Sequence, residues 1–263
     1  MSVIGKVESV WRYPVKSMRG DELSEAFAGF SGVYGDRLYA FHSSTSPKGF
    51  PYLTARDQRK LLLYRPRFRH PDKAARPINL AEAESLGPGV NPVSADAAEL
   101  TVDVETPTGE TLAIDDPALI HMLRDGVRNS PDLKLLRSER AMTDCRPISL
   151  ISIQTIRKLG DELGASVDPR RFRANIYLDL NAAGGFAEDG FLGRSLRIGS
   201  KAVLSILERD PRCAMITLDP DTGESKPEFL KKVAQAHNGM AGIYAAVLVE
   251  GTVRKGDPVE RLN

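Results

Sequence analysis

The apolar residues of this chain fall in short alternating runs, and this pattern restricts the folds that it can adopt. Residues 3–12 alternate and are rich in valine, which predicts a β-strand that ends before Pro14. Residues 38–41 predict a second strand. Two further runs, 100–104 and 111–114, flank a Pro-Thr-Gly segment and predict a hairpin. These runs favour sheets built from short strands.

Helices are fewer, and we expect three of them. Asp116 and Pro117 form an N-cap and first-turn pair, which predicts a helix start. The other two helices are predicted within residues 152–164 and 227–239, where apolar residues recur at helical spacing before a glycine. Residues 242–259 then predict a long strand, a break and a short return strand.

The mixture of many short strands and a few helices is typical of an α+β or mainly-β protein built around barrels. A doubly wound sheet would need a regular alternation of strands and helices. Residues 66–98 show little periodicity and predict a long irregular connection. A chain of 263 residues fits one large domain or two modest ones. We expect a boundary near residues 115–130, which gives domains 1–120 and 121–263.

Charge and hydropathy narrow the partners that we expect. The formal net charge is +1, which gives no overall attraction to nucleic acid or to an anionic membrane. No apolar run is long enough to cross a bilayer. Lys6 and Glu8 interrupt the N-terminal segment, where a signal peptide needs a continuous apolar region. We therefore expect a cytoplasmic protein with no nucleic-acid or membrane partner.

The chain has two cysteines, Cys145 and Cys213, and we expect both to be reduced. Cys213 follows Arg212, and a neighbouring arginine favours the thiolate, which is the form that acts as nucleophile and metal ligand. A buried, inert cysteine is the simpler alternative. Cys145 follows Asp144, whose charge would raise a thiol pKa, so we interpret Cys145 as structural.

Two segments carry groups that suit a bound anion. Lys16 and Ser17 offer a point charge and a hydroxyl donor where a strand is expected to end, and Arg37 offers a planar guanidinium. The simpler alternatives are an exposed lysine at a turn and an ion pair between Arg37 and Asp36.

A third segment adds an arginine and an amide. Arg173 and Asn175 are two positions apart at the expected start of a strand, so their side chains would share one face. Such a pair can hold a phosphate and a polar ring edge together.

Three motifs carry a resemblance to a known family. The segment PRCAMITLDPDTG at residues 211–223 resembles the cysteine segment of the MOSC family, named after the C-terminal domain of molybdenum cofactor sulfurases. The segments VESVWRYPVKSMRG at 7–20 and GVYGDRLYAF at 32–41 resemble the N-terminal β-barrel domain that precedes MOSC in the amidoxime-reducing branch.

The resemblance implies a fold, a cofactor and a set of site residues. The fold would be an N-terminal β-barrel-like domain and a C-terminal MOSC β-barrel with a few helices. The cofactor would be molybdenum cofactor (molybdopterin), held in the cleft between the domains. Cys213 would be the catalytic residue and the metal ligand. The cofactor-binding residues would be Lys16, Ser17, Arg37, Arg173, Asn175 and Arg212.

Three function classes remain open at this point. The resemblance favours an oxidoreductase that reduces small N-hydroxylated or N-oxide substrates. Its electrons would come from a separate donor protein, because two cysteines cannot build a four-cysteine iron–sulfur cluster. The alternative is a cofactor carrier or sulfur-transfer protein that uses a Cys213 persulfide. The third class is an anion-binding regulatory domain. Met18 and Arg19 depart from the family pattern after Lys-Ser, which weakens any inference about substrate identity.

Overall fold

The structure is a computed structural model, and it describes residues 2–85 and 90–262 of the chain. The chain divides into two compact units. Unit 1 comprises Met1–Arg12, Gly20–Val33 and Thr143–Asn263, and unit 2 comprises Tyr13–Arg19 and Tyr34–Met142. Each unit is therefore assembled from separate segments of the chain, whereas the domain division at 120/121 is a prediction about continuous segments.

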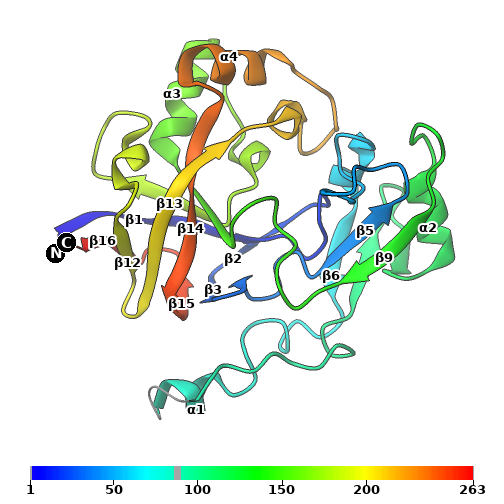
Figure 1. The fold of residues 1–263 in the computed structure, drawn as a ribbon, viewed down its shortest axis with the longest axis horizontal. Helices are drawn as coiled ribbons and strands as arrows, with labels where there is room; N and C mark the ends of the chain where they lie inside the picture. The colour runs from blue at the N-terminus through cyan, green and yellow to red at the C-terminus, as the bar shows by residue number, and fades with distance from the viewer. Residues whose placement is uncertain (1, 86–89, 263) are drawn as a thin grey trace. The chain divides into compact units, whose positions relative to one another are not determined.

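Unit 1 contains a closed barrel of seven strands (Figure 1). Neighbouring strands follow the order β1, β11, β10, β14, β13, β12 and β16, and β16 pairs with β1 again. The pair of β10 and β11 is parallel, and the other pairs of the barrel are antiparallel. The barrel strands are β1 (Ser2–Arg12), β10 (Ile148–Ser152), β11 (Ile176–Leu180), β12 (Ser195–Ile198), β13 (Ala202–Pro211), β14 (Met240–Val249) and β16 (Pro258–Leu262).

The remaining strands of unit 1 lie outside this ring. The short strand β2 (Asp21–Leu23) pairs with β1. A separate three-stranded sheet contains β15 (Gly251–Arg254), β3 (Glu25–Gly29) and β4 (Gly32–Val33). Together these elements confirm the predicted mainly-β fold. They also explain why residues 3–12 alternate, since β1 must face the barrel interior along one side.

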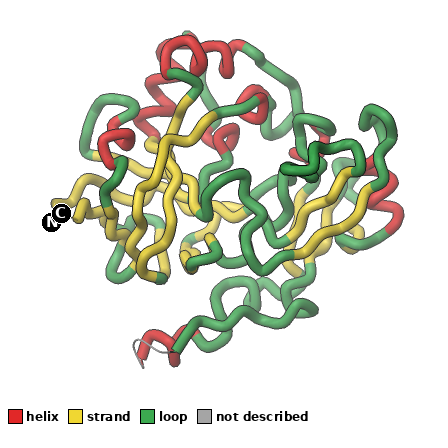
Figure 2. The backbone as a smooth tube through the Cα atoms, in the orientation of Figure 1, coloured by secondary structure: helices red, strands yellow, loops and turns green. Residues whose placement is uncertain are grey.

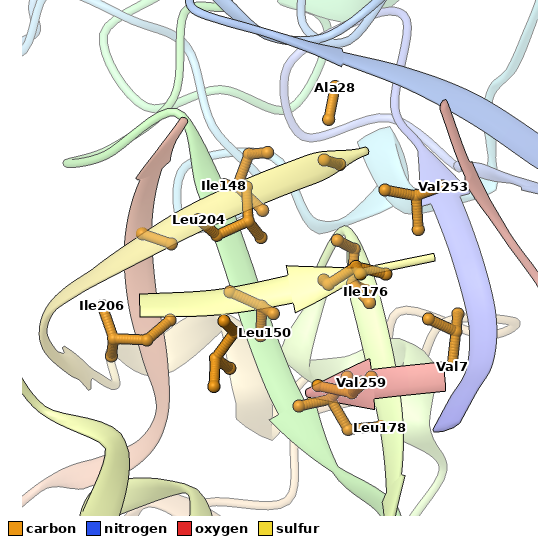
Figure 3. Packing of buried hydrophobic residues seen from close by; sticks show 14 of the residues in the cluster. Val7, Ala28, Ile148, Leu150, Ile176, Leu178, Leu204, Ile206, Val253 and Val259 are labelled. Carbon is orange, nitrogen blue, oxygen red and sulfur yellow. The ribbon is translucent and has the colours of Figure 1, made fainter. Parts of the chain in front are cut away.

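The barrel interior is filled by aliphatic side chains that alternate along the strands. Figure 3 shows Val7 of β1, Leu150 of β10, Ile176 of β11, Leu204 of β13 and Val259 of β16 packed together. Each of these side chains is at most 1% exposed. The barrel is therefore a packed core and a rigid support for the loops at its ends.

Two helices of unit 1 follow the predicted pattern. Helix α3 (Ile153–Leu163) begins after Ser152, whose Oγ accepts a hydrogen bond from the amide of Thr155, and it ends before Gly164. Helix α4 (Glu228–His237) ends with Asn238 in the left-handed conformation. The helices pack on each other in a second apolar cluster that includes Ile156, Leu159, Phe229 and Val233. Short 3-10 helices complete the unit at η2 (Pro169–Phe172), η3 (Ala187–Phe191) and η4 (Ala214–Thr217).

Unit 2 contains two small sheets. One pairs β5 (Tyr39–Ser43) with β9 (Leu133–Arg137), and the other contains β6 (Arg65–Phe68), β7 (Val102–Glu105) and β8 (Thr111–Ala113). The predicted hairpin is confirmed as β7 and β8. The sequence pattern gave no indication of β9, whose residues are all partly or largely exposed.

The helices of unit 2 are short. Helix α2 (Pro117–Arg124) begins after Asp116, whose side chain accepts a hydrogen bond from the amide of Ala118, as predicted. The segment between β6 and β7 is mostly loop in Figure 2, with helix α1 (Leu80–Ser85) as its regular element in the described part. Residues 86–89 of the predicted irregular connection lie outside the described residues. The 3-10 helix η1 (Arg59–Leu63) precedes β6.

Among the helices of residues 2–85 and 90–262, none has the length and apolar character needed to span a bilayer.

Candidate functional site

Cys213 lies where strand β13 ends and the 3-10 helix η4 begins. Its backbone is extended, with φ of −115° and ψ of −175°, and its carbonyl accepts the amide hydrogen of Ile216 at 3.2 Å. The residue is half-buried and its thiol is free. The structure therefore does not bear out the alternative of a fully buried cysteine, because Cys213 stays partly exposed.

A turn downstream stabilises this segment. The Oδ1 atom of Asp219 accepts the amides of Asp221 and Thr222 at 3.0 and 3.1 Å. The carbonyl of Asp219 accepts the amide of Gly223 at 2.8 Å. Arg171 then donates from Nη2 to Asp219 Oδ2 at 2.8 Å. The DPDTG motif is thus a closed turn that is fixed to η2.

Arg212, directly before Cys213, points into the protein. Its side chain is 7% exposed. Nε donates to the carbonyl of Ala241 at 2.6 Å, and Nη1 donates to the carbonyl of Phe172 at 3.0 Å. Nη2 lies 2.7 Å from Oδ2 of Asp210. The guanidinium therefore connects the cysteine segment to β14 and to the segment that contains Arg173.

Asp210 is the buried counter-ion of this arginine. It is 2% exposed, and its Oδ2 accepts the hydroxyl of Ser149 at 2.9 Å. Burial raises the pKa of Asp210, and the charge of Arg212 opposes that increase. The phenol of Tyr244 is held neutral, because burial and the nearby Asp210 both raise its pKa.

Gly242 provides the space for the Arg212 guanidinium. Its φ is +83°, which a side chain disfavours. A Cβ there would lie 2.6 Å from the carbonyl oxygen of Leu150 and 3.0 Å from Nη2 of Arg212. A glycine is therefore required both by the backbone and by the packing.

The prediction that Arg173 starts a strand is wrong. Strand β11 begins at Ile176, and Arg173 ends η2 in the left-handed conformation with φ of 52°. The chain makes this bend before it enters the barrel, so the alternation of side chains along a strand does not relate Arg173 to Asn175.

Asn175 is 1% exposed and bridges two strands of the barrel. Its Oδ1 accepts the amide of Ser149 at 3.3 Å, and its Nδ2 donates to the carbonyl of Trp11 at 3.3 Å. These bonds give the side chain a structural role between β10 and β1.

Cys145 is exposed, and its thiol donates to Glu208 Oε1 at 3.3 Å. The protein around Cys145 removes part of the water from its thiol, which raises the pKa of this group. The hydrogen bond to Glu208 raises the pKa further. The expected direction is confirmed, and its largest electrostatic cause is Glu208. A neutral thiol is a poor nucleophile, which distinguishes Cys145 from a reactive cysteine.

In unit 2, Lys16 is 5% exposed and is therefore not an ordinary surface lysine. Its Nζ donates to the carbonyl of Met142 at 2.8 Å and lies 4.9 Å from the ring centroids of Phe50 and Tyr52. The next residue, Ser17, is 7% exposed and has a positive φ of 65°. The bend at Ser17 follows the bridge between Val15 and Tyr39.

Arg37 forms the ion pair with Asp36 that was the alternative to anion binding. Its guanidinium carbon also lies 4.7 Å from the ring centroid of Tyr13, and Asp36 accepts the amide of Tyr13 at 2.7 Å. The carbonyl of Arg37 accepts the amide of Met142 at 3.0 Å. Lys16 and Arg37 therefore both hold Met142, the last residue of unit 2.

The structure thus gathers the site residues into two sets. Within unit 1, the Arg212 side chain joins the segments of Cys213 and Arg173, and Asn175 lies directly before β11. Within unit 2, Lys16 and Arg37 meet at Met142. Sequence reasoning missed Asp210, Gly242 and the rings of Phe50 and Tyr52, because single residues of these types carry no motif. Among the residues that the structure describes, no group of three or more His, Cys, Asp or Glu side chains is arranged to hold a metal ion.

Comparison with known proteins identifies the family to which the chain belongs. The model of the MOSC N-terminal beta barrel domain matches residues 4–116, and the model of the MOSC domain matches residues 137–260. Each residue of the two sets that was expected to bind a cofactor lies inside one of these matches.

The curated relatives share moderate identity with the chain. It is similar to mitochondrial amidoxime reducing component 2 of Rattus norvegicus, with 34% identity over 47% of this chain and 39% of that protein. It is similar to mitochondrial amidoxime-reducing component 1 of Mus musculus, with 27% identity over 97% of this chain and 82% of that protein. The chain therefore spans less than half of the rat relative and most of the mouse relative in these matches.

Among solved structures, the YUAD protein from Bacillus subtilis matches with a TM-score of 0.48 and 14% identity, over 98% of this chain and 94% of that chain. The two family models together include most of the chain, in the order that the sequence motifs predicted. The protein belongs to the MOSC-domain family and combines a MOSC N-terminal beta barrel domain with a MOSC domain.

Proposed function

We propose that this protein binds molybdenum cofactor and reduces small N-hydroxylated or N-oxide substrates with electrons from a separate donor protein. The observation that carries the proposal is the free, half-buried thiol of Cys213 in a segment that Arg212 fixes to the Arg173 segment. The curated relatives are named for amidoxime reduction, and an amidoxime is an N-hydroxylated compound.

The chemistry of the residues fits this cofactor in part. Cys213 offers a soft sulfur ligand for the metal, and Arg173 offers a cation for the phosphate. In unit 2, Ser17 adds a hydroxyl, whereas the cations of Lys16 and Arg37 already contact the Met142 carbonyl and Asp36 and must exchange these partners to bind an anion. Arg212 and Asn175 fit less well, because their side chains are already bonded to backbone carbonyls, amides and Asp210. We therefore propose that these two residues support the site rather than contact the cofactor.

When bound, the cofactor supplies the two-electron redox chemistry, and the protein supplies binding and orientation. Reduction of an N–OH group consumes two electrons and two protons, breaks the N–O bond and releases water. Cys213 would hold the metal as a thiolate. Within unit 1, Arg173 would balance negative charge on the phosphate.

The test uses protein produced in a host that makes the cofactor. We expect stoichiometric molybdenum and reduction of an aryl amidoxime with a reduced viologen as donor. NADH alone should give no turnover, and turnover with NADH alone would contradict the external donor.

The same preparation separates the alternatives. A labile, cyanide-releasable sulfur on Cys213 without molybdenum would reject the reductase and support a sulfur carrier. Absence of both molybdenum and labile sulfur would leave only an anion-binding domain.

A further inference from the structure

The ammonium group of Lys16 is enclosed by two aromatic rings. Phe50 and Tyr52 lie edge to face, with centroids 5.2 Å apart and planes at 89°. Both ring centroids are 4.9 Å from Nζ of Lys16, within the range of a cation–π contact. We call these two residues the aromatic pair. Since Lys16 is only 5% exposed, an external anion cannot reach the ammonium while the pair covers it.

A second cation lies against the same ring. The guanidinium carbon of Arg56 is 5.0 Å from the centroid of Phe50, and its Nε donates to Thr54 Oγ1 at 3.3 Å. In contrast to Lys16, Arg56 is exposed. Phe50 therefore contacts one enclosed cation and one cation that solvent reaches.

The segment that carries Phe50 is anchored at one end and exposed at the other. Tyr52 forms a bridge with His42, and the amide of Leu53 donates to the carbonyl of Phe41 at 2.8 Å. By contrast, residues 47–49 are exposed, and a Cβ on Gly49 would meet no atom within 4 Å. Phe50 is half-buried and its amide donates to the carbonyl of Pro47 at 2.9 Å, so it lies between this exposed turn and Tyr52, which is attached to β5.

From these contacts we infer that Phe50, packed against the fixed Tyr52, is a gate over Lys16, and that Arg56 is the outer contact for a phosphate group that pairs with Lys16 when Phe50 moves aside. No motif points to Phe50, Tyr52 or Arg56. Phosphate is the class that fits, because a guanidinium and an ammonium both pair with its oxygens. The inference rests on the proposed anion-binding role of Lys16, but it needs no bound cofactor.

The first arm of the test measures access to Lys16 in protein without cofactor. The protein is treated with an acetylating reagent, and acetylation of Lys16 and of the exposed Lys48 is followed by mass spectrometry. We expect Lys16 to react much more slowly than Lys48. Phe50→Leu should raise the Lys16 rate several-fold relative to Lys48, whereas Phe50→Tyr should keep the parental ratio. An unchanged ratio in Phe50→Leu would overturn the gate.

The second arm uses inorganic phosphate as the probe. In the Phe50→Leu protein, phosphate should slow the acetylation of Lys16 in a saturable manner. Arg56→Gln in the same background should weaken this protection several-fold, and Arg59→Gln, a change at a nearby exposed arginine, should leave it unchanged. Equal protection with and without Arg56 would show that Arg56 does not contact the phosphate. Absence of any protection would show that phosphate does not bind beside Lys16.

The two arms stay informative whatever the enzyme assay shows. A gate and a phosphate effect without molybdenum would reject the proposed reductase and keep this inference. Molybdenum and turnover with no change in the acetylation of Lys16 would keep the proposed reductase and reject this inference.

Discussion

Nη1 of Arg212 donates a hydrogen bond to the carbonyl oxygen of Phe172 at 3.0 Å, across 40 positions of sequence. The bond joins the residue before Cys213 to the residue before Arg173. The two segments proposed to hold the metal and the phosphate therefore depend on one buried side chain. Arg212 is thus a positioning residue for both segments.

Cys213→Ser should abolish amidoxime reduction and leave the fold intact. The change removes the soft sulfur but nearly conserves the volume, so we expect a loss of stability below about 1.5 kcal/mol. Turnover, molybdenum content and thermal unfolding are measured on the same preparation. The matched control is Cys145→Ser, which should retain parental turnover. Parental activity in Cys213→Ser together with loss in Cys145→Ser would reverse the assignment of the two cysteines.

Arg212→Met should strongly destabilise the protein, because it leaves Asp210 buried without its counter-ion. Breaking a buried ion pair by removing one partner costs about 3–5 kcal/mol. The control is Arg197→Met, which breaks a partly exposed pair with Glu260 and should cost less than about 1 kcal/mol. Urea unfolding of both variants measures the difference, and similar midpoints would show that the Arg212 contacts contribute little.

Gly242→Ala tests the space that the guanidinium occupies. The control is Gly109→Ala, since Gly109 also has a positive φ of +88° but a Cβ there would meet no atom within 4 Å. Both variants carry backbone strain of about 1–3 kcal/mol. Gly242→Ala should cost about 1–3 kcal/mol more, because its Cβ would overlap the Leu150 carbonyl. Equal losses of stability would mean that the barrel adjusts around the added carbon.

The sequence predicted the elements whose information is local. Strand β1 follows from its alternation, and helix α3 follows from Ser152 at its start and Gly164 at its end. The closure of the barrel could not be predicted in this way. It depends on β1 pairing with β11 and β16, whose residues lie far away in sequence.

The candidate site shows the same limit. Cys213, Lys16 and Arg37 carry recognisable motifs, so their positions could be named in advance. The partners of Arg212 could not, because its bonds to Phe172 and Ala241 span distant segments. The left-handed conformation of Arg173 could not be predicted either. Arginine rarely adopts a positive φ, and no adjacent residue in the sequence signals one here.

Glu208→Gln should make Cys145 more reactive at neutral pH. The pKa of the Cys145 thiol is raised by removal from water and then by the hydrogen bond to Glu208. Replacing the carboxylate removes the second cause, so the pKa should fall and thiolate should form at lower pH. The measurement is the pH profile of iodoacetamide alkylation in a Cys213→Ser background, where only Cys145 reacts. Its midpoint should shift to lower pH in Glu208→Gln. Glu260→Gln, which removes a carboxylate that pairs with Arg197, should leave the profile in place. A midpoint that does not move would assign the raised pKa to removal from water alone.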